Sequence, residues 1–332
     1  MHRRIVFILL LLFLSCNIHA QTIIRCQSET FPGGIIRITA VTSDSLKSIS
    51  ADLENTKSLI IARFEGFKYS TDTIQELSAE STPRLECYIV IVSFDPALKS
   101  GNYSISVNFE EENSETSEIR IFPVVLKERI FRKETIALDE NLSDLRSDDS
   151  ERRKAETREL VGYLTSFNSK NIFSDTNIMK PIMNKPLTTS FFGDIRNFVY
   201  KNGVSVKSIH NGIDLAISAG TPVHCSASGR VIYCGSRLIT GNSVIIEHLP
   251  GLFTIYYHLE KIYTVADQIL PKGAVIGLVG STGLSTGPHL HWEMRNQMTP
   301  VDPEYFTAAP LIDKDEIISI INSEFSDLAR GR

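Results

Sequence analysis

Short β-branched runs separated by turn residues dominate the first third of the chain and constrain its fold most strongly. The runs are rich in Ile, Val and Tyr and occupy residues 35–39, 58–62, 88–92 and 103–107. Several short strands at this spacing are typical of an antiparallel β-sandwich. We therefore predict that residues 21–125 form a β domain.

The turn before the last of these runs refines that prediction. The segment 99–103, with the sequence KSGNY, resembles the turn and tyrosine that lead into a strand of immunoglobulin-like domains. We expect an immunoglobulin-like β-sandwich over residues 21–125. The resemblance says nothing about a ligand, and any protein partner of the chain is assigned to this domain.

The chain changes character after Pro123. Residues 126–186 are predicted to form a charged, partly helical linker, in which Asp149 or Ser150 caps a helix. Strand patterns with Gly-rich turns return over residues 187–306, so a second, antiparallel β domain is expected there. Apolar residues at helical spacing then predict a helical tail within 307–332 that docks on the body of the protein.

A length of 332 residues suits two domains and a linker. The formal net charge of -5 gives no global basic field of the kind that attracts nucleic acid. Nucleic acid is therefore not an expected partner.

The first twenty residues predict export. Arg3 and Arg4 precede an unbroken apolar run at 5–14, and small residues precede Gln21. This is the organisation of a secretory signal peptide, cleaved after Ala20. A second interpretation treats 13–16 as a relaxed lipobox and Cys16 as a lipid anchor. Both interpretations place the protein in the periplasm or cell envelope.

Four cysteines remain after residue 20, which is an even number in a compartment where disulfides persist. Pairing within each half, Cys26 with Cys87 and Cys225 with Cys234, is the simplest of the three connectivities. Buried free thiols are the alternative.

Six of the eight histidines lie between residues 210 and 291. His210 and Asp214 are four residues apart, and His289 and His291 are two apart. Even spacing places both members of a pair on one face of a strand, and the β-branched neighbours favour strand over helix. Two neighbouring strands could thus direct three ligands to one metal.

Three protein ligands with an open position are typical of a catalytic zinc, whereas a structural zinc is closed by four. The closed site is the alternative interpretation, with His224, His248 or His258 as the fourth ligand. Thiolates would close it only if Cys225 and Cys234 were reduced.

Three motifs resemble those of the lysostaphin/LytM-type zinc metallopeptidases, which carry H-x-x-x-D, then Tyr-x-His-Leu, then a Ser/Thr/Gly run ending in His-Leu-His. This chain has HNGID at 210–214, YYHL at 256–259 and GSTGLSTGPHLHWE at 280–293. The resemblance covers about residues 187–306.

The resemblance implies one zinc ion bound by His210, Asp214 and His291, with His258 and His289 as catalytic residues. It also implies a duplicated β motif in the fold and hydrolysis of peptide cross-links in peptidoglycan, whose peptide stems would be the partner. The alternative function is a non-hydrolytic, wall-binding activator of a separate amidase.

Two weaker expectations complete the prediction. Asn242, Ser281 and Thr282 are predicted to contact the substrate backbone, since they lie in or near glycine-rich turns. The asparagines of the linker, or the N-terminal domain, are predicted to cover the groove and restrain activity; these asparagines are Asn168, Asn171, Asn177 and Asn184.

Overall fold

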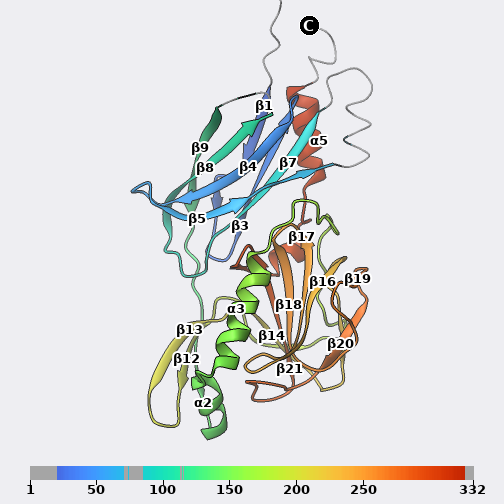
Figure 1. The fold of residues 1–332 in the computed structure, drawn as a ribbon. Coiled ribbons are helices and arrows are strands. Elements are labelled where there is room, and N and C mark those ends of the chain that lie inside the picture. The colour runs from blue at the N-terminus through green and yellow to red at the C-terminus, as the bar shows by residue number, and fades with distance from the viewer. Residues whose placement is uncertain (1–20, 71–73, 75–84, 113, 115, 326–332) are drawn as a thin grey trace, which may run out of the picture.

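The computed structural model describes residues 21–70, 74, 85–112, 114 and 116–325. The predicted signal peptide, Cys16 included, and residues 326–332 lie outside the described residues. Two β-rich lobes are stacked end to end, and the linker runs down one side of the second lobe (Figure 1). The prediction of a mainly β protein is confirmed.

Two sheets form the N-terminal lobe. The first has the order β1-β3-β7-β6 and the second the order β2-β9-β8-β4-β5. Their bounds are β1 (Thr22–Cys26), β2 (Glu29–Thr30), β3 (Ile35–Thr42), β4 (Leu46–Glu54), β5 (Ile60–Glu65), β6 (Phe67–Tyr69), β7 (Glu86–Ser93), β8 (Gly101–Glu111) and β9 (Ser117–Leu126). The immunoglobulin-like topology remains a prediction.

Strands β3 and β7 are buried on both faces. Ile36, Ile38 and Ala40 of β3 pack into the core between the two sheets. Ile35 and Val41 point the other way and belong to a cluster that continues into the second lobe. Because side chains alternate along a strand, β3 supplies both cores, which explains its nearly continuous apolar sequence.

The second lobe is built on a ten-stranded sheet whose main path is β11-β14-β21-β18-β17-β16-β19. Its strands are β11 (Leu187–Ser190), β14 (Gly212–Ala216), β15 (Pro222–His224), β16 (Gly229–Arg237), β17 (Gly241–Leu249), β18 (Leu252–Ile262), β19 (Ile269–Leu270), β20 (Val275–Val279), β21 (His289–Asn296) and β22 (Thr299–Val301). Strands β14, β21 and β18 are antiparallel neighbours, and their registers position the candidate site.

The linker contains the predicted helix, α3 (Glu151–Thr165), together with a second helix and a strand that were not predicted. Helix α2 (Glu140–Ser147) precedes α3, and Ser150 caps α3 by accepting a hydrogen bond from the Arg153 backbone N–H. Leu160 and Leu164 of α3 pack on the sheet of the second lobe. Strand β10 (Lys133–Ala137) was not predicted; it adds a parallel edge to the hairpin of β12 (Ile195–Val199) and β13 (Ser205–Ile209).

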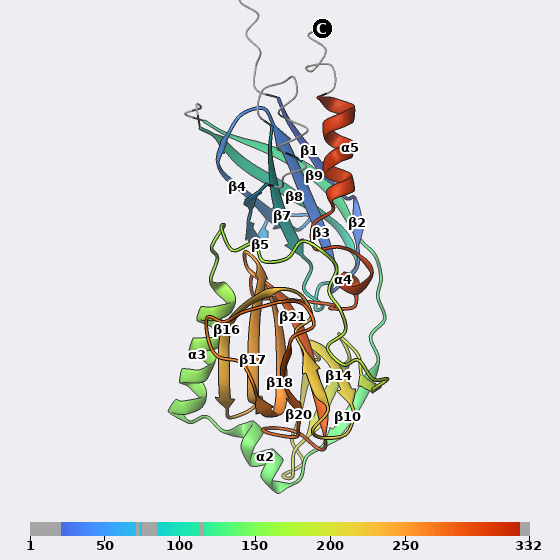
Figure 2. The ribbon, with the colours of Figure 1, turned by 90° about the vertical axis from the view of Figure 1, so that its right-hand side faces the viewer.

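The C-terminal segment forms α4 (Tyr305–Ala308) and α5 (Lys314–Glu324). Asp313 caps α5 by accepting a hydrogen bond from the Glu316 backbone N–H. The helix lies beside the N-terminal lobe (Figure 2), and the Thr39 hydroxyl donates to Glu316 at 2.9 Å. The tail therefore docks as predicted, on the lobe farther away in sequence. Within the described part of the chain, helices are too short or too polar to cross a bilayer.

The predicted disulfides are wrong, because all four cysteines are free. Cys26 and Cys87 lie on strands separated by β3, and Cys26 is opposite Ile38 whereas Cys87 is opposite Val41. Two strand spacings amount to roughly 9.5 Å, beyond the roughly 7 Å between Cα atoms that a disulfide tolerates. Cys225 instead donates to the Ala227 carbonyl within the core. Burial raises the pKa of Cys225 to about 12.

Candidate active site

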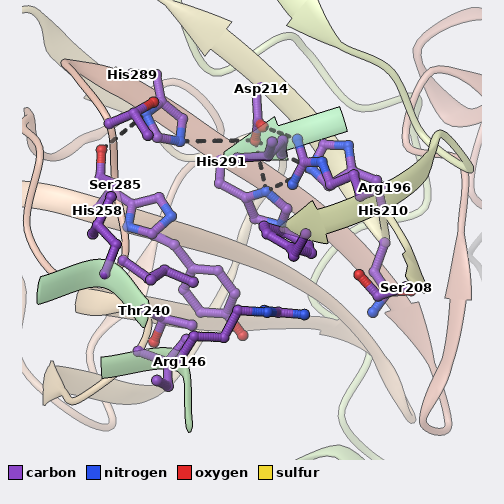
Figure 3. Close-up of a pocket in the computed structure, with 18 of the residues that line it drawn as sticks. Arg146, Arg196, Ser208, His210, Asp214, Thr240, His258, Ser285, His289 and His291 are labelled. Carbon is purple, nitrogen blue, oxygen red and sulfur yellow. Dashed lines mark hydrogen bonds and ion pairs between the residues drawn. The ribbon is translucent and has the colours of Figure 1, made fainter. Parts of the chain in front are cut away.

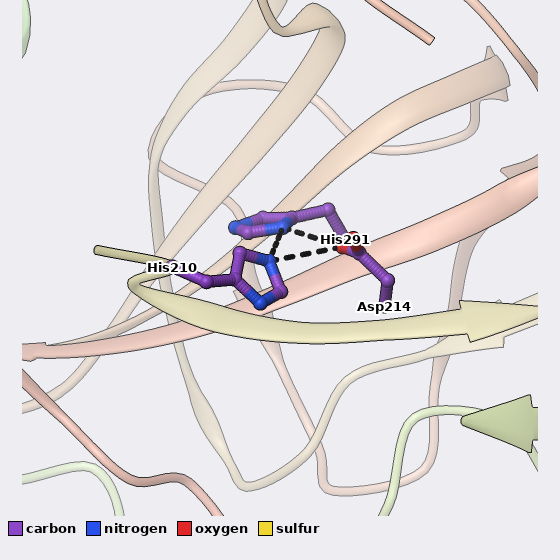
Figure 4. Close-up of side chains that lie close together, drawn as sticks. All are labelled: His210, Asp214 and His291. Carbon is purple, nitrogen blue, oxygen red and sulfur yellow. Dashed lines mark hydrogen bonds and ion pairs between the residues drawn. The ribbon is translucent and has the colours of Figure 1, made fainter. Parts of the chain in front are cut away.

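Asp214 and His291 are directly opposite each other on the neighbouring strands β14 and β21. His210 lies just before β14, so all three side chains converge on one point (Figure 4). His291 Nδ1 is 2.8 Å from Asp214 Oδ1, and His210 Nε2 is 3.0 Å from His291 Nδ1 and 3.2 Å from Asp214 Oδ1. All three residues are buried. The strand spacing in the sequence predicted this convergence.

Outer hydrogen bonds orient each of the three side chains. His210 Nδ1 lies 2.9 Å from the Phe191 carbonyl and donates to it, which leaves Nε2 facing the cluster. His291 Nε2 lies 3.2 Å from Glu293, which leaves Nδ1 facing the cluster. Asp214 presents Oδ1 to both histidines, while its Oδ2 pairs with Arg196. Such outer contacts are the usual way in which proteins fix the orientation of metal ligands.

The cluster stabilises positive charge. Burial by itself would lower the pKa of His291, but hydrogen bonds to Asp214 and Glu293 outweigh burial and raise that pKa to about 9. Burial would raise the pKa of Asp214, but hydrogen bonds from His210 and His291 hold it well below its usual range. Two imidazole nitrogens and one carboxylate oxygen, all within 4.8 Å of one another, therefore fit a divalent transition-metal ion.

His258 and His289 lie beside this cluster (Figure 3), with their ring centroids 4.7 Å apart. Each ring is anchored through Nδ1, which lies 2.7 Å from the Thr282 carbonyl in His258 and 2.8 Å from the Gly287 carbonyl in His289. Because Nδ1 donates to a carbonyl, Nε2 of each neutral ring keeps a lone pair. Nε2 of His289 lies 3.9 Å from Asp214 Oδ1.

His258 has an unusual backbone and an unusual acidity. Its φ of 62° lies in the left-handed region, which non-glycine residues rarely adopt. Burial, followed by the electrostatic effect of the neighbouring His289 and His291 rings, lowers the pKa of His258 to about 3. Its imidazole is therefore neutral at physiological pH. Backbone strain of this kind concentrates at functional sites.

These residues open into a cavity of about 310 Å³. Part of the lining comes from the linker and the β12–β13 hairpin, and another part from the loops that carry Thr240 and Ser285. Besides the five predicted site residues, the lining comprises Ile136, Leu138, Leu142, Arg146, Arg196, Phe198, Ser208, Ile209, Asn211, Ile239, Thr240, Tyr257, Leu284, Ser285, Thr286 and Glu293.

The three predicted substrate-binding residues lie outside this lining. The Asn242 side chain donates to the Leu259 and Glu260 carbonyls, and the Thr282 hydroxyl donates to the Leu259 carbonyl. Ser281 is exposed and bonds to Ser285. These bonds hold the glycine-rich loop against β17 and β18. The polar atoms of Asn242 and Thr282 that would contact a substrate therefore already have partners within the protein. Leu284, Ser285 and Thr286 are the members of that loop that line the cavity.

The alternative ligands and the predicted covering segment also lie elsewhere. His248 is buried between the Ser228 carbonyl and the Thr254 hydroxyl, and His224 lies close to the Pro181 carbonyl. The linker asparagines do not line the cavity. Asn171 bonds to Glu247 and Asn177 to the Thr307 carbonyl, so this segment packs along the lobe and does not cover the site. The lining likewise contains no residue of the N-terminal lobe.

Sequence reasoning missed three charged residues of the site. Glu293 follows His291 by two positions, so the strand periodicity that paired His289 with His291 would have identified it. Arg196 and Arg146 gave no such signal. Both approach from the linker and the β12–β13 hairpin, whose pairing with β10 is not visible in the sequence pattern.

Comparisons with known proteins concentrate on this lobe. The model of peptidase family M23 matches residues 208–303. The chain is 47% identical over 95 residues to the DD-carboxypeptidase/endopeptidase Mpg of Neisseria meningitidis, a match that covers 29% of this chain and 22% of that protein. It is 43% identical over 93 residues to the peptidoglycan DD-endopeptidase ShyA of Vibrio cholerae, which covers 28% of this chain and 22% of that protein. The matched region thus spans about a fifth of the length of these relatives.

The fold likeness reaches further than the sequence likeness. A crystal structure of a Pseudomonas aeruginosa protein assigned to peptidase M23 superposes with a TM-score of 0.55 at 23% identity. The superposition covers 84% of this chain and 95% of that one, so it includes much of the N-terminal lobe. The cluster of His210, Asp214 and His291 and the family match fall on the same strands, so the part of the chain that is similar to peptidase family M23 contains the candidate site.

Proposed function

We propose that this protein is a zinc-dependent endopeptidase that hydrolyses peptide cross-links of bacterial peptidoglycan. The observation that carries the proposal is the convergence of His210, Asp214 and His291 on one point, beside two Nδ1-anchored histidines in a cavity open to a peptide. The relatives in Neisseria and Vibrio are named as endopeptidases, which supports the same reaction.

His210 Nε2, His291 Nδ1 and Asp214 Oδ1 are the atoms that would hold the zinc ion. Bound there, zinc would polarise the scissile carbonyl and lower the pKa of a water molecule to about 7. Arg196 and Glu293 keep the carboxylate and the imidazole turned toward this position, since each bonds the ligand on the side away from the cluster.

His258 and His289 would carry the proton transfers. Each has an Nε2 lone pair, because Nδ1 is committed to a backbone carbonyl. One ring would take the proton of the attacking water and return it to the leaving amine, and the other, when protonated at Nε2, would stabilise the oxyanion that develops on the carbonyl. Asp214 lies near His289 Nε2 and would stabilise that ring when it gains a proton.

The choice of cross-link rests on the relatives. The name of ShyA specifies a DD-endopeptidase, so a bond between two D-configured centres is the proposed target. Export to the periplasm or cell envelope, by cleavage after Ala20 or by lipidation at Cys16, remains our proposal, supported by the signal-like sequence of residues 1–20.

A non-hydrolytic role as an activator of an amidase fits the site less well. An activator needs only a surface that binds the amidase. This chain has all three candidate metal-binding residues, His210, Asp214 and His291, with outer hydrogen bonds that orient their side chains. We therefore retain the hydrolase as the proposed function.

The test is digestion of purified cross-linked muropeptides by residues 21–332 with zinc, followed by mass spectrometry. We expect two monomers with one new amine and one new carboxylate, which identify the bond. His289→Ala and Asp214→Asn should abolish the products, whereas His224→Gln should retain them because His224 lies outside the cavity. A protein that binds stoichiometric zinc and releases no fragment would instead support the activator.

A further inference from the structure

Four charged side chains line the cavity in addition to the histidines: Arg146, Arg196, Asp214 and Glu293. Three of them are neutralised within the protein. Asp214 pairs with Arg196, and Glu293 pairs with Arg295 at 2.9 Å. Within the described ranges, Arg146 has no carboxylate within salt-bridge distance. The cavity therefore presents one positive charge without a counter-ion.

The surroundings of Arg146 hold its guanidinium in place. Its Cζ lies 3.7 Å from the centroid of the Phe198 ring, and its side chain also interacts with Tyr200. Arg153 donates to the Arg146 backbone carbonyl at 2.6 Å, which fixes the last turn of α2. The guanidinium, carried by α2, thus contacts Phe198 and Tyr200, and Figure 3 shows Arg146 among the side chains that line the pocket with the histidines.

This arrangement leaves hydrogen-bonding capacity unused. Nε of Arg146 is buried and has no hydrogen-bond partner. Burial lowers the pKa of Arg146, yet an arginine stays charged under any physiological condition. A buried donor without a partner and a charge without a counter-ion both cost free energy. A carboxylate entering the cavity would satisfy both, because the guanidinium fork matches a carboxylate in a bidentate manner.

We propose that Arg146 binds a free carboxylate of the substrate's stem peptide and makes this carboxylate a determinant of specificity. The inference rests on the proposed function, since it assigns a feature of the peptide that the site cleaves. Ile136, Leu138 and Leu142 line the same wall and would contact the aliphatic part of that residue. A stem peptide whose carboxylate is amidated would leave the Arg146 charge unpaired.

The test compares cross-linked dimers in which one carboxylate at a time is converted to a carboxamide. One series amidates the carboxylate beside the scissile bond and the other the C-terminal carboxylate. Wild type should lose about tenfold to hundredfold in kcat/KM on one of them, the range expected for a hydrogen bond between charged groups. Arg146→Met, which keeps the aliphatic stem over Phe198, should cut the free and amidated dimers equally. Arg146→Lys should restore part of the preference.

Arg158→Met is the matched control, because Arg158 is an exposed arginine of the neighbouring helix α3 and does not line the cavity. It should keep the preference of wild type. Equal cleavage of all dimers by wild type would overturn the proposal. So would an Arg146→Met variant that is slower on every dimer and retains the wild-type preference, because Arg146 would then act only through structure.

A binding measurement separates this inference from the proposed function. The Arg146 Nε–H resonance should shift when the free stem tetrapeptide is added and should stay in place with its fully amidated form. A wild-type protein that cuts no dimer would refute the proposed function. A shift of the Arg146 Nε–H resonance would still show in that case whether Arg146 binds the carboxylate. No shift with either peptide would overturn the Arg146 proposal.

Discussion

Asp214 uses its two carboxylate oxygens for different contacts. Oδ1 faces His210 and His291, while Oδ2 pairs with Arg196, which also donates to Glu134 at 2.5 Å through its Nε. The orientation of one proposed metal ligand therefore depends on β12 and, through Glu134, on strand β10 of the linker. The spacing of the sequence predicted Asp214 as a site residue but not Arg196. The ion pair between Arg196 and Asp214 forms because the fold brings β12 close to β14.

Replacing Arg196 tests this dependence. Arg196→Gln should weaken zinc binding about tenfold to hundredfold, the range for loss of an outer contact to a metal ligand, because Asp214 Oδ2 loses its charged partner. Chelator competition measures the affinity. Arg132→Gln is the control, since Arg132 pairs with Asp194 and does not touch Asp214. An unchanged affinity in Arg196→Gln would show that the ion pair does not orient the ligand.

His248 should make the protein sensitive to acid. Burial lowers its pKa to about 4, whereas an unfolded histidine titrates near 6.5. The folded state thus favours the neutral ring, so stability is full above pH 6.5 and falls as the pH drops toward 4. A difference of this size corresponds to about 3 kcal/mol.

Urea unfolding between pH 7 and 4 measures this effect. His248→Gln removes the titration, and its free energy of unfolding should fall less steeply with acid than that of wild type. His224→Gln, which alters a half-buried histidine on β15, should follow the wild-type slope. Parallel slopes for wild type and His248→Gln would contradict the assignment.

At the level of elements, the linker proved to be more ordered than the sequence suggested. Helix α3 was predictable from its cap, and Ser150 caps it. Strand β10 was not predictable, because Ile136 is the one large apolar residue among its five and its partner hairpin lies some sixty positions away. Local patterns report on local structure, and a single added edge strand leaves almost no local signal.

Gly193 connects β11 to β12 and sets the position of Arg196. Its φ is +84°, and a Cβ there would lie 2.0 Å from the Phe131 ring. Gly193→Ala should therefore destabilise the protein by more than the roughly 1 kcal/mol of a left-handed alanine and weaken zinc binding by shifting β12. Gly203→Ala, at the tip of the β12–β13 hairpin, is the matched control, because the φ of Gly203 is +82° and the space around it is open. Equal losses in thermal unfolding would exclude a role for the Phe131 contact.

At the level of the whole molecule, the two lobes share one apolar cluster that runs from β3 and β7 into the peptidase sheet and α5. Buried polar contacts reinforce the joint. The Asn296 side chain donates to the Ile91 carbonyl at 2.7 Å and lies 2.8 Å from the Ser93 hydroxyl. The sequence predicted two separate domains with a linker, because hydrophobic periodicity identifies buried faces and not the partners that cover them.

The shared cluster predicts a single unfolding transition. Trp292, the one tryptophan of the chain, is buried in the peptidase lobe, so its fluorescence reports on that lobe, whereas far-UV circular dichroism reports on all strands. The two curves should coincide in urea. Asn296→Ala should lower the midpoint, by about 1–3 kcal/mol in free energy. Two separated transitions in wild type would show that the lobes fold independently.

The joint between the lobes also limits how the second lobe can be reused. Gly33 lies against Phe192, and Gln297 exchanges hydrogen bonds with the backbone of Glu65, so two loops of the second lobe have a neighbour from the first lobe. A chimera that transplants residues 187–306 onto a foreign carrier would bring an uncovered apolar seam with it and would aggregate. The shared seam therefore favours chimeras in which both lobes are transferred together.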